Sequence, residues 1–337
     1  MRWSLLLLCF LTACWESEDT RKNRFLLKGN AALEEQNEEQ AIQYFREALR
    51  IDSCFADAHN NIGTVLFRQQ KFVEALESYN HSIACKPGFL NAYFNRSNTL
   101  YELGRAEEAL VDIEKVLLER ADTVPGLFLC GLVFTKMREF KKAQDAFIKA
   151  SLYDSVNSEI YVNLGTLNYY QKQYAEATAY LDKAILLSPK EANAFNARAL
   201  VEIESGDLVT AMHSVNNAIA LKPGNAFYRN NRGYIYLLRN ELALALTDID
   251  YSIATDPYNG WAYRNKGIYY LKTNDASSAI RLLTQAIELE PTVELAYYYL
   301  SKAYFAIGDM NKGCEFWRES LNRKEIEGKD YDLLCPN

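Results

Sequence analysis

The sequence lacks the features of a nucleic-acid-binding protein and of an enzyme. Lys and Arg together number 37 against 44 Asp and Glu, so the formal net charge is −7 and there is no basic excess to contact phosphates. The three histidines, His59, His81 and His213, lie at spacings that form no metal-ligand set. Phosphate-loop, dinucleotide-binding, nucleophile-elbow, zinc-protease and Cys-x-x-Cys motifs are missing from the chain. We therefore expect no enzymatic activity, no metal site and no cofactor.

The chain also begins with an apolar run that is too short to span a bilayer. Leu5 to Leu11 follows Arg2 and precedes the tetrapeptide Leu11-Thr12-Ala13-Cys14. That tetrapeptide resembles the lipobox of bacterial lipoproteins. The resemblance implies a signal peptide over residues 1–13, cleavage before Cys14, and lipidation (palmitate) of Cys14, followed by a tether over 14–21.

The acidic residues after Cys14 leave the final location open. They are similar to short signals that export some lipoproteins of the Bacteroidetes type to the cell surface, but they also suit a solvated linker. We expect an outer-membrane lipoprotein of the bacterial cell envelope, on either the periplasmic or the surface leaflet.

Small residues recur with a period of 34 through almost the whole chain. One register contains only Gly, Ala and Ser, at Gly29, Gly63, Ser97, Gly131, Gly165, Ala199, Gly233, Gly267 and Ser301. A second is Ala except for its last member, at Ala41, Ala75, Ala109, Ala143, Ala177, Ala211, Ala245, Ala279 and Gly313. Prolines recur in the same register at Pro87, Pro189, Pro223, Pro257 and Pro291. A fixed period of this length indicates a repeat architecture.

Residues 260–293 show what one repeat contains. The apolar spacing predicts two amphipathic helices, joined by a turn at Thr273 to Asp275 in which Asp275 is the N-cap of the second helix. Pro291 ends that second helix. Gly267 and Ala279 fall where the two helices cross, because a close crossing requires little side-chain bulk. A hairpin of this kind needs neighbours to cover its apolar face.

The period and the residue pattern together resemble the tetratricopeptide repeat family. The resemblance implies an all-α, right-handed superhelical solenoid of nine tandem 34-residue helical hairpins with a concave groove. The expected repeats span 22–55, 56–89, 90–123, 124–157, 158–191, 192–225, 226–259, 260–293 and 294–327, and a capping tail covers 328–337. Members of this family are mostly binding scaffolds.

The resemblance also identifies the positions that line the groove. Five repeats carry asparagine at the sixth position, at Asn61, Asn95, Asn163, Asn231 and Asn265. A column of carboxamides can pair with an extended peptide backbone, as in the asparagine ladder of O-linked N-acetylglucosamine transferases. Alternatively, these amides form hydrogen bonds only within the scaffold.

The last three repeats differ from the first six in groove charge. Their groove positions hold the aromatic residues Phe227, Tyr234, Trp261, Tyr298 and Phe305, and their charged residues are Arg264, Lys272 and Lys302. Repeats 1–6 instead hold Glu34, Asp57, Glu102, Glu159 and Glu204 against Arg68 and Lys136. We predict that the C-terminal third binds an acidic or C-terminal peptide, centred on Trp261 and Arg264.

Seven cysteines suit an exported protein. We expect Cys314 and Cys335 to form a disulfide that fastens the C-terminal end, and Cys130 to be a core residue. Whether Cys54 and Cys85 pair is left open.

Two functions remain from these observations. The first is a membrane-anchored scaffold for protein–protein interaction in cell-envelope assembly, which binds a partner protein or extended peptide. The second is a surface subunit of a glycan or peptide uptake complex.

Overall fold

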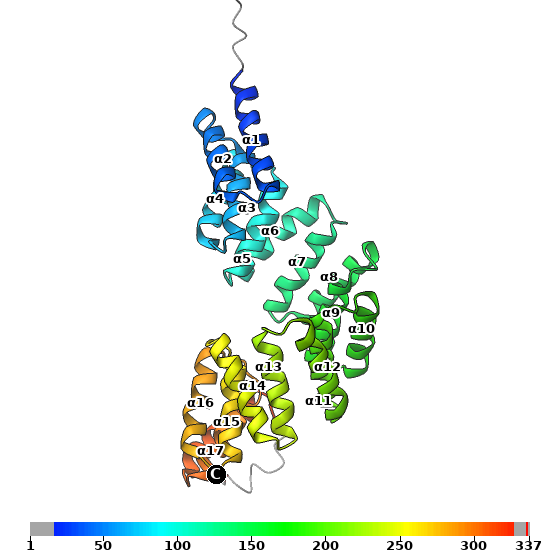
Figure 1. The fold of residues 1–337 in the computed structure, drawn as a ribbon, viewed down its shortest axis with the longest axis vertical. Helices are drawn as coiled ribbons and strands as arrows, with labels where there is room; N and C mark the ends of the chain where they lie inside the picture. The colour runs from blue at the N-terminus through cyan, green and yellow to red at the C-terminus, as the bar shows by residue number, and fades with distance from the viewer. Residues whose placement is uncertain (1–16, 327–334, 336–337) are drawn as a thin grey trace, which may run out of the picture. The chain divides into compact units, whose positions relative to one another are not determined.

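The computed structural model describes residues 17–326 and residue 335, and every regular element in that part of the chain is an α-helix (Figure 1). Successive helices pair as nine hairpins, from α1–α2 to α17–α18. The all-α class and the nine tandem hairpins predicted from the 34-residue period are therefore confirmed.

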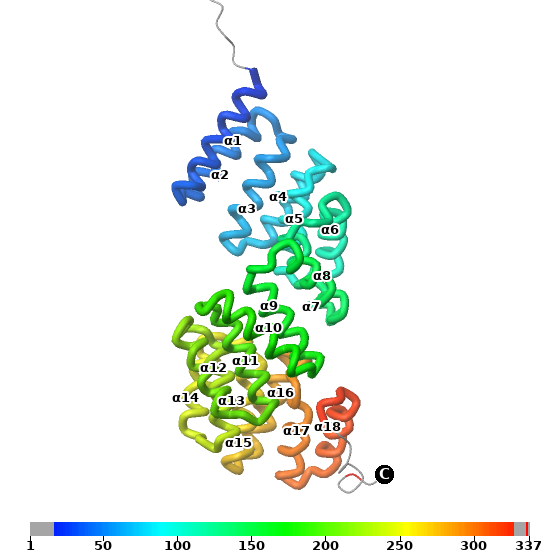
Figure 2. Tube along the Cα trace, turned by 90° about the vertical axis from the view of Figure 1, so that its right-hand side faces the viewer, coloured from blue at the N-terminus to red at the C-terminus, as the bar shows by residue number. Residues whose placement is uncertain are grey.

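The chain divides into two compact blocks, residues 1–155 and 156–337. Hairpins follow one another in chain order within each block (Figure 2). The N-terminal block contains α1 (Glu18–Glu34), α2 (Glu38–Ile51), α3 (Ala56–Arg68), α4 (Phe72–Cys85), α5 (Leu90–Glu102), α6 (Ala106–Glu119), α7 (Val124–Lys136) and α8 (Phe140–Tyr153). The C-terminal block contains α9 (Ser158–Tyr170), α10 (Tyr174–Leu187), α11 (Ala192–Glu204), α12 (Leu208–Leu221), α13 (Ala226–Leu238), α14 (Leu242–Thr255), α15 (Gly260–Lys272), α16 (Ala276–Leu289), α17 (Ala296–Ala306) and α18 (Met310–Asn322).

The small residues lie where the two helices of a hairpin cross. A Cβ atom placed on Gly267 would lie 2.6 Å from Cγ of Leu283, and Ala279 on the facing helix is fully buried. The equivalent Gly63 lies under the ring of Tyr79 in the same way. Close approach of the helices thus depends on the absence of side-chain bulk at these positions.

Each hairpin turn contains one residue in the left-handed region of backbone space. These residues recur every 34 positions, at Gln36, Gln70, Gly104, Arg138, Lys172, Gly206, Asn240, Asn274 and Gly308. After the turn at Asn274, the Asp275 side chain accepts a hydrogen bond from the Ser278 backbone N–H at 3.0 Å, so its predicted role as N-cap is confirmed.

The first helix begins earlier than the repeat register suggests. Residues 18–21, expected to belong to the tether, form the first turn of α1. Ser17 accepts a hydrogen bond from the Thr20 backbone N–H, and Glu18 and Asp19 place negative charge at the helix N-terminus. The proposed signal peptide, Cys14 and most of the expected capping tail lie outside the described residues.

Ion pairs brace the helices of both blocks. Asp248 of α14 is almost fully buried and accepts hydrogen bonds from Arg232 and Arg229 of α13. In the N-terminal block, Arg96 of α5 pairs with the buried Asp112 of α6 in the same way. These guanidinium groups hold the two helices of a hairpin together.

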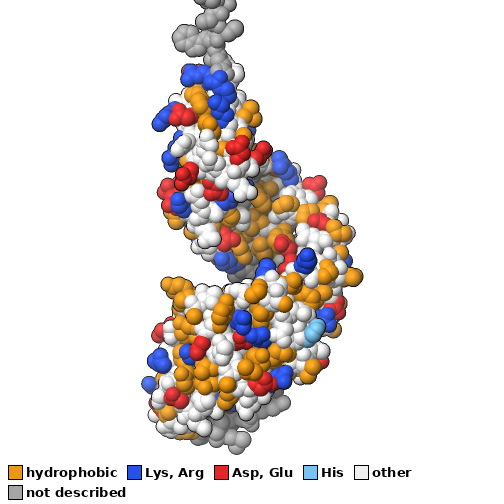
Figure 3. Space-filling view, in the orientation of Figure 1, with side chains coloured by type: hydrophobic (Ala, Val, Ile, Leu, Met, Phe, Trp, Pro, Cys, Tyr) orange, Lys and Arg blue, Asp and Glu red, His pale blue; other side chains and the backbone are white. Residues whose placement is uncertain are grey.

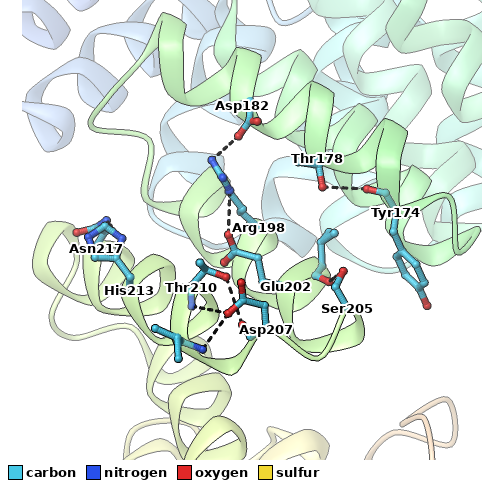
Figure 4. A network of polar contacts seen from close by, with 12 residues as sticks. Tyr174, Thr178, Asp182, Arg198, Glu202, Ser205, Asp207, Thr210, His213 and Asn217 are labelled. Atoms are coloured by element: carbon cyan, nitrogen blue, oxygen red, sulfur yellow. Dashed lines mark hydrogen bonds and ion pairs between the residues drawn. The ribbon is translucent and has the colours of Figure 1, made fainter.

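A related brace joins adjacent hairpins in the C-terminal block. Arg198 of α11 bonds both to Asp182 of α10 and to Glu202 on its own helix (Figure 4). The brace therefore ties the repeat that contains α11 to the preceding repeat.

Candidate functional site

The first helix of each hairpin forms the inner face of its block. Within the C-terminal block α9, α11, α13, α15 and α17 contact one another in sequence, whereas the second helices of neighbouring hairpins are farther apart. Units of a curved array lie closest together on its concave side, so the surface formed by these first helices is the concave, inner face. The groove positions predicted from the sequence lie on these helices.

Most of the predicted groove asparagines bond to a neighbouring hairpin. The side-chain N–H of Asn61 donates to Asn30, Asn95 donates to Asn60, Asn231 donates to Asn196 and Asn265 donates to Asn230, at 2.8–2.9 Å. Asn163 instead donates to the backbone carbonyl of Glu159 on its own helix. The amides are thus used by the scaffold in the way that the second interpretation anticipated. Asn265 is completely buried and offers no surface to a partner.

Arg264 is also buried, with only 5% of its surface exposed. Its guanidinium carbon lies 4.8 Å from the ring centres of both Tyr234 and Trp261. Two of its nitrogens donate to the side-chain oxygen of Asn265, and the third donates to the backbone carbonyl of Glu294 at 3.0 Å. The structure therefore differs from the expectation that Arg264 is an accessible cation, because all of its nitrogens bond within the scaffold.

The contact with Glu294 coincides with a delayed start of the last hairpin. The first helix of the preceding hairpin, α15, begins at Gly260, and the equivalent position in the last repeat is Glu294. However, α17 begins only at Ala296, and Leu295 adopts a left-handed conformation with φ of 62°. A leucine rarely adopts this conformation, so the segment is locally strained. Glu294 and Leu295 are therefore not part of α17, and the backbone carbonyl of Glu294 accepts its hydrogen bond from Arg264 instead.

Two carboxylates approach Arg264 across the inner face. Glu204, the last residue of α11, keeps an exposed side chain, yet the surrounding protein limits its hydration and the charge of Glu294 opposes its own. Both effects raise the pKa of Glu204, and the positive charges of Lys172 and Arg264, together with a hydrogen bond from the Tyr174 hydroxyl, only partly offset them. Burial, followed by the charges of Glu204 and Glu294, likewise raises the pKa of Tyr169. Side chains from α9, α11, α15 and the start of the last hairpin therefore interact electrostatically.

This interaction links residues that the sequence analysis placed in separate parts of the groove. Glu204 was assigned to the acidic repeats 1–6, but it interacts with Arg264 of repeat 8. Glu294 was missed because it occupies the first position of its repeat, outside the expected groove column. The curvature of the block brings them together, and no spacing along the sequence encodes that approach. Glu204 ends its helix, where the helix dipole disfavours a negative charge. This position was the one feature of the sequence that could have indicated an unusual environment for Glu204.

The remaining predicted partner-binding residues are more accessible than Arg264. Lys272 and Lys302 are exposed, and the Lys302 ammonium lies 4.6 Å from the centre of the Tyr298 ring. Tyr298 is partly buried and packs edge-on against Trp317. Tyr234 and Trp261 are also partly buried. On the face seen in Figure 3, acidic and basic side chains are interspersed among hydrophobic ones.

Within the part of the chain that the structure describes, four cysteines form two disulfides. One joins Cys314 of α18 to Cys335, with a Cα–Cα distance of 5.4 Å. The other joins Cys54, in the turn after α2, to Cys85, the last residue of α4, and this is the pair that the sequence left open. Cys130 is a buried free thiol, and burial raises its pKa to about 11.

Residues 17–326 and 335 contain neither a metal-binding cluster nor a helix suited to cross a membrane. In this part of the chain, Cys, His, Asp and Glu do not cluster in a way that could hold a metal ion. Its helices are each too short or too polar to cross a bilayer. The inner face of the C-terminal block is therefore the candidate site that we consider further.

The hairpins and their inner face define a helical repeat protein. Family models described as tetratricopeptide repeat match residues 26–88, 90–123, 158–191 and 264–312, which together make up just over half of the chain. The chain belongs to the tetratricopeptide repeat family.

Curated relatives share this repeat region at modest identity. The chain is 29% identical over 221 residues to human protein O-mannosyl-transferase TMTC3, which covers 58% of this chain and 24% of that protein. It is 32% identical over 109 residues to the wheat Hsp70-Hsp90 organizing protein, which covers 32% of this chain and 19% of the relative. The chain thus spans about a quarter or less of these two relatives.

A third relative is more similar in length. The chain is 27% identical over 172 residues to the type IV pilus assembly protein PilF of Pseudomonas aeruginosa, which covers 50% of this chain and 67% of that protein. The solved structure of PilF superposes with a TM-score of 0.55 at 23% identity, over 63% of this chain and 96% of that one. The Cut9–Hcn1 structure superposes with a TM-score of 0.65 at 17% identity, over 96% of this chain and 64% of that one. At these identities the structures show the shared fold.

Proposed function

We propose that this protein is a scaffold that holds a partner protein on the inner face of its C-terminal block while Cys14 anchors it to a membrane of the bacterial cell envelope. The partner contributes an extended segment, and the role is one of assembly rather than catalysis. Membership of the tetratricopeptide repeat family supports the scaffold role, because repeats of this type present long concave binding surfaces.

The single observation that carries this proposal is the aromatic inner face. Phe227 at the start of α13 is 50% exposed, and Tyr170 at the end of α9 is 52% exposed. Trp261 at the start of α15 occupies the same repeat position as Phe227 and is partly exposed. Large aromatic side chains that remain in water on a concave surface are typical of binding sites, because they bury much area with few rotatable bonds.

The printed names of two relatives agree with an assembly role. PilF is a type IV pilus assembly protein, and the wheat relative is an organizing protein for Hsp70 and Hsp90. The similarity to PilF, together with the lipobox-like residues Leu11 to Cys14, favours a place in envelope assembly.

A capture experiment tests this proposal. The tagged full chain is recovered from detergent-solubilised membranes, and proteins that copurify with it are identified and quantified. We expect the double variant Phe227→Ala, Trp261→Ala to lose most of the captured partner. Arg264 is left unchanged because it is buried, and its replacement would disturb the scaffold.

A matched control is available on the outer helices. Leu244 of α14 is also 50% exposed, so Leu244→Ala removes exposed apolar area from the second helix of the repeat that contains Phe227. Equal loss of partner from both variants, or no loss from the inner-face variant, contradicts the proposed site. Helicity and melting temperature are compared to exclude unfolding.

A further inference from the structure

The first helix, α1, has one side that no other helix covers. Gly29, on the packed side, lies against the ring of Phe45 of α2. Leu27, on the other side, is 67% exposed. The exposed residues recur at helical spacing, at Thr20, Asn23, Arg24, Leu27, Lys28 and Ala31. We call these six residues the outer face of α1.

Basic side chains gather on and beside the first half of this face. Arg24 and Lys28 are exposed on either side of Leu27, and Arg21 is partly exposed at the edge. Figure 3 shows Lys and Arg side chains at the end of the N-terminal block where α1 begins. The exposed acids Glu34 and Glu35 lie at the other end of the helix. The half of the outer face that begins the array is therefore positive.

The acids in the first turn of α1 point away from the outer face. At 3.6 residues per turn, Glu18 and Asp19 lie roughly 120° and 140° round the helix from Arg24. Asp19 pairs with Lys22 at 2.7 Å, and Lys22 also pairs with Asp52 after α2 at 2.8 Å. These groups are thus engaged on the packed side of the helix, and they do not neutralise the cations of the outer face.

The proposed lipid anchor is very close to this helix in the chain. Only Trp15 and Glu16 separate Cys14 from Ser17, the N-cap of α1. An extended chain spans at most about 3.6 Å per residue, so the Cα atoms of Cys14 and Ser17 lie within about 11 Å of each other. Tryptophan, the residue type at position 15, favours the membrane interface. Acyl chains on Cys14 therefore hold the start of α1 at the lipid headgroups.

We propose that the outer face of α1 lies on the membrane in which Cys14 is anchored. Arg21, Arg24 and Lys28 contact anionic lipid headgroups, and Leu27 enters the boundary between headgroups and acyl chains. The short distance to the anchor and the sign of the charge together select an anionic membrane as the occupant. This proposal rests on the anchoring part of the proposed function, and it concerns a surface separate from the partner site.

A fluorescent label on the outer face tests the contact. The lipidated full chain carries Asn23→Cys, labelled with an environment-sensitive dye, and is reconstituted into vesicles that contain lipid-borne quenchers. Ala220→Cys, at an exposed position of α12 in the C-terminal block, is the matched label. With phosphatidylglycerol in the vesicles, we expect about fivefold stronger quenching at position 23 than at position 220. Vesicles of phosphatidylcholine alone, or high salt, should reduce this difference.

Two charge variants assign the contact to the outer face. Arg24→Gln, Lys28→Gln keeps long polar side chains but removes two cations, and it should lower the quenching at position 23 about threefold. Lys141→Gln, Lys149→Gln removes two exposed lysines from α8 of the same block, and it should leave that quenching unchanged. Circular dichroism of both variants checks that the helices are intact.

Each other outcome overturns the inference. Quenching at position 23 that is no stronger than at position 220 shows that α1 stays in water. Quenching that depends neither on phosphatidylglycerol nor on Arg24 and Lys28 rules out the recognition of anionic headgroups, and equal loss in the α8 variant rules out the assigned face. A mature protein without acyl chains on Cys14 removes the anchor on which the contact depends. The scaffold role is judged separately, by partner capture with the Phe227 and Trp261 variant.

Discussion

At the scale of single residues, the hairpins depend on what is missing from their crossing points. Gly267 lies against Leu283, and Gly233 lies against Ile249, each where a Cβ atom would come within 3 Å of the neighbour. The sequence predicted these contacts because the small residues recur every 34 positions. The sequence did not predict how much space surrounds the other glycines. Gly224, for example, has nothing within 4 Å of the position that a Cβ atom would take.

This contrast gives a first prediction. Gly267→Val should lower the free energy of unfolding by about 2–3 kcal/mol, because the added methyl groups overlap a fully buried leucine. Gly224→Val, in a turn with room for the side chain, should change it by about 0.5 kcal/mol or less. Urea unfolding followed by circular dichroism measures both. Equal effects at the two positions would show that packing at the crossing does not limit stability.

At the scale of helices and hairpins, the asparagines connect repeats. Each of the bonds from Asn95, Asn231 and Asn265 joins the sixth position of one repeat to the fifth position of the preceding repeat. The residue type and its period were visible in the sequence, and both the scaffold role and the peptide-binding role fitted them. Only the side-chain directions distinguish the two roles, because a carboxamide can serve either one.

The buried bond predicts a coupling between hairpins. Asn265→Ala should lower the free energy of unfolding by about 2–3 kcal/mol, because it leaves buried groups of Asn230 and Arg264 without a partner. A double-mutant cycle with Asn230→Ala should give an interaction energy of about 1 kcal/mol or more. Asn163→Ala is the control, since Asn163 bonds only to its own helix, and a loss of the same size there would refute the interpretation.

The last hairpin depends on a covalent link as well. Cys335 is joined to Cys314 over a sequence separation of 21, a loop for which a disulfide contributes about 3 kcal/mol by restricting the unfolded chain. Cys335→Ser should therefore speed amide hydrogen exchange in α17 and α18 and leave α1 and α2 unaffected, as measured by mass spectrometry. Exchange that stays unchanged in α17 and α18 would mean that packing alone secures the end of the array.

The start of α17 shows why element boundaries were harder to predict than elements. The repeat register places the start of this helix at Glu294, but Arg264 binds that residue's carbonyl and the helix begins at Ala296. In addition, the carboxylate of Glu325 accepts a hydrogen bond from the backbone N–H of Tyr298 in its first turn. Arg264 comes from the preceding hairpin and Glu325 lies beyond the end of α18, so residues next to Glu294 in the sequence gave no indication of either partner.

At the scale of the whole molecule, the sequence predicted the order and number of the hairpins but not which groove residues meet. A fixed period determines what is repeated, and the nine hairpins that it predicted are present in the described part of the chain. The interaction of Glu204, Arg264 and Glu294 depends instead on how strongly the C-terminal block curves. That curvature is the sum of small differences in packing between successive hairpins. The sequence of a single repeat does not determine these differences.

The location of the molecule gives the last prediction. Cys14 lies outside the described residues, so its lipidation stays a prediction from the preceding residues Leu11 to Ala13. Mass spectrometry of the N-terminal peptide should show an acylated Cys14 as the first residue, because the lipobox-like tetrapeptide directs cleavage before it. Cys14→Ser should move the protein from the membrane fraction to the soluble fraction. An unmodified N-terminus at another residue would contradict the prediction.

The asparagine bonds between repeats also determine how such a chain responds to tension. Each bond spans the junction between one hairpin and the next, so a pull along the array loads these junctions in series, and each junction carries the full force instead of a share of it. The force needed to open the array is then set by its weakest junction, whatever the number of repeats. An array built in this way is expected to yield one hairpin at a time and to lengthen in steps.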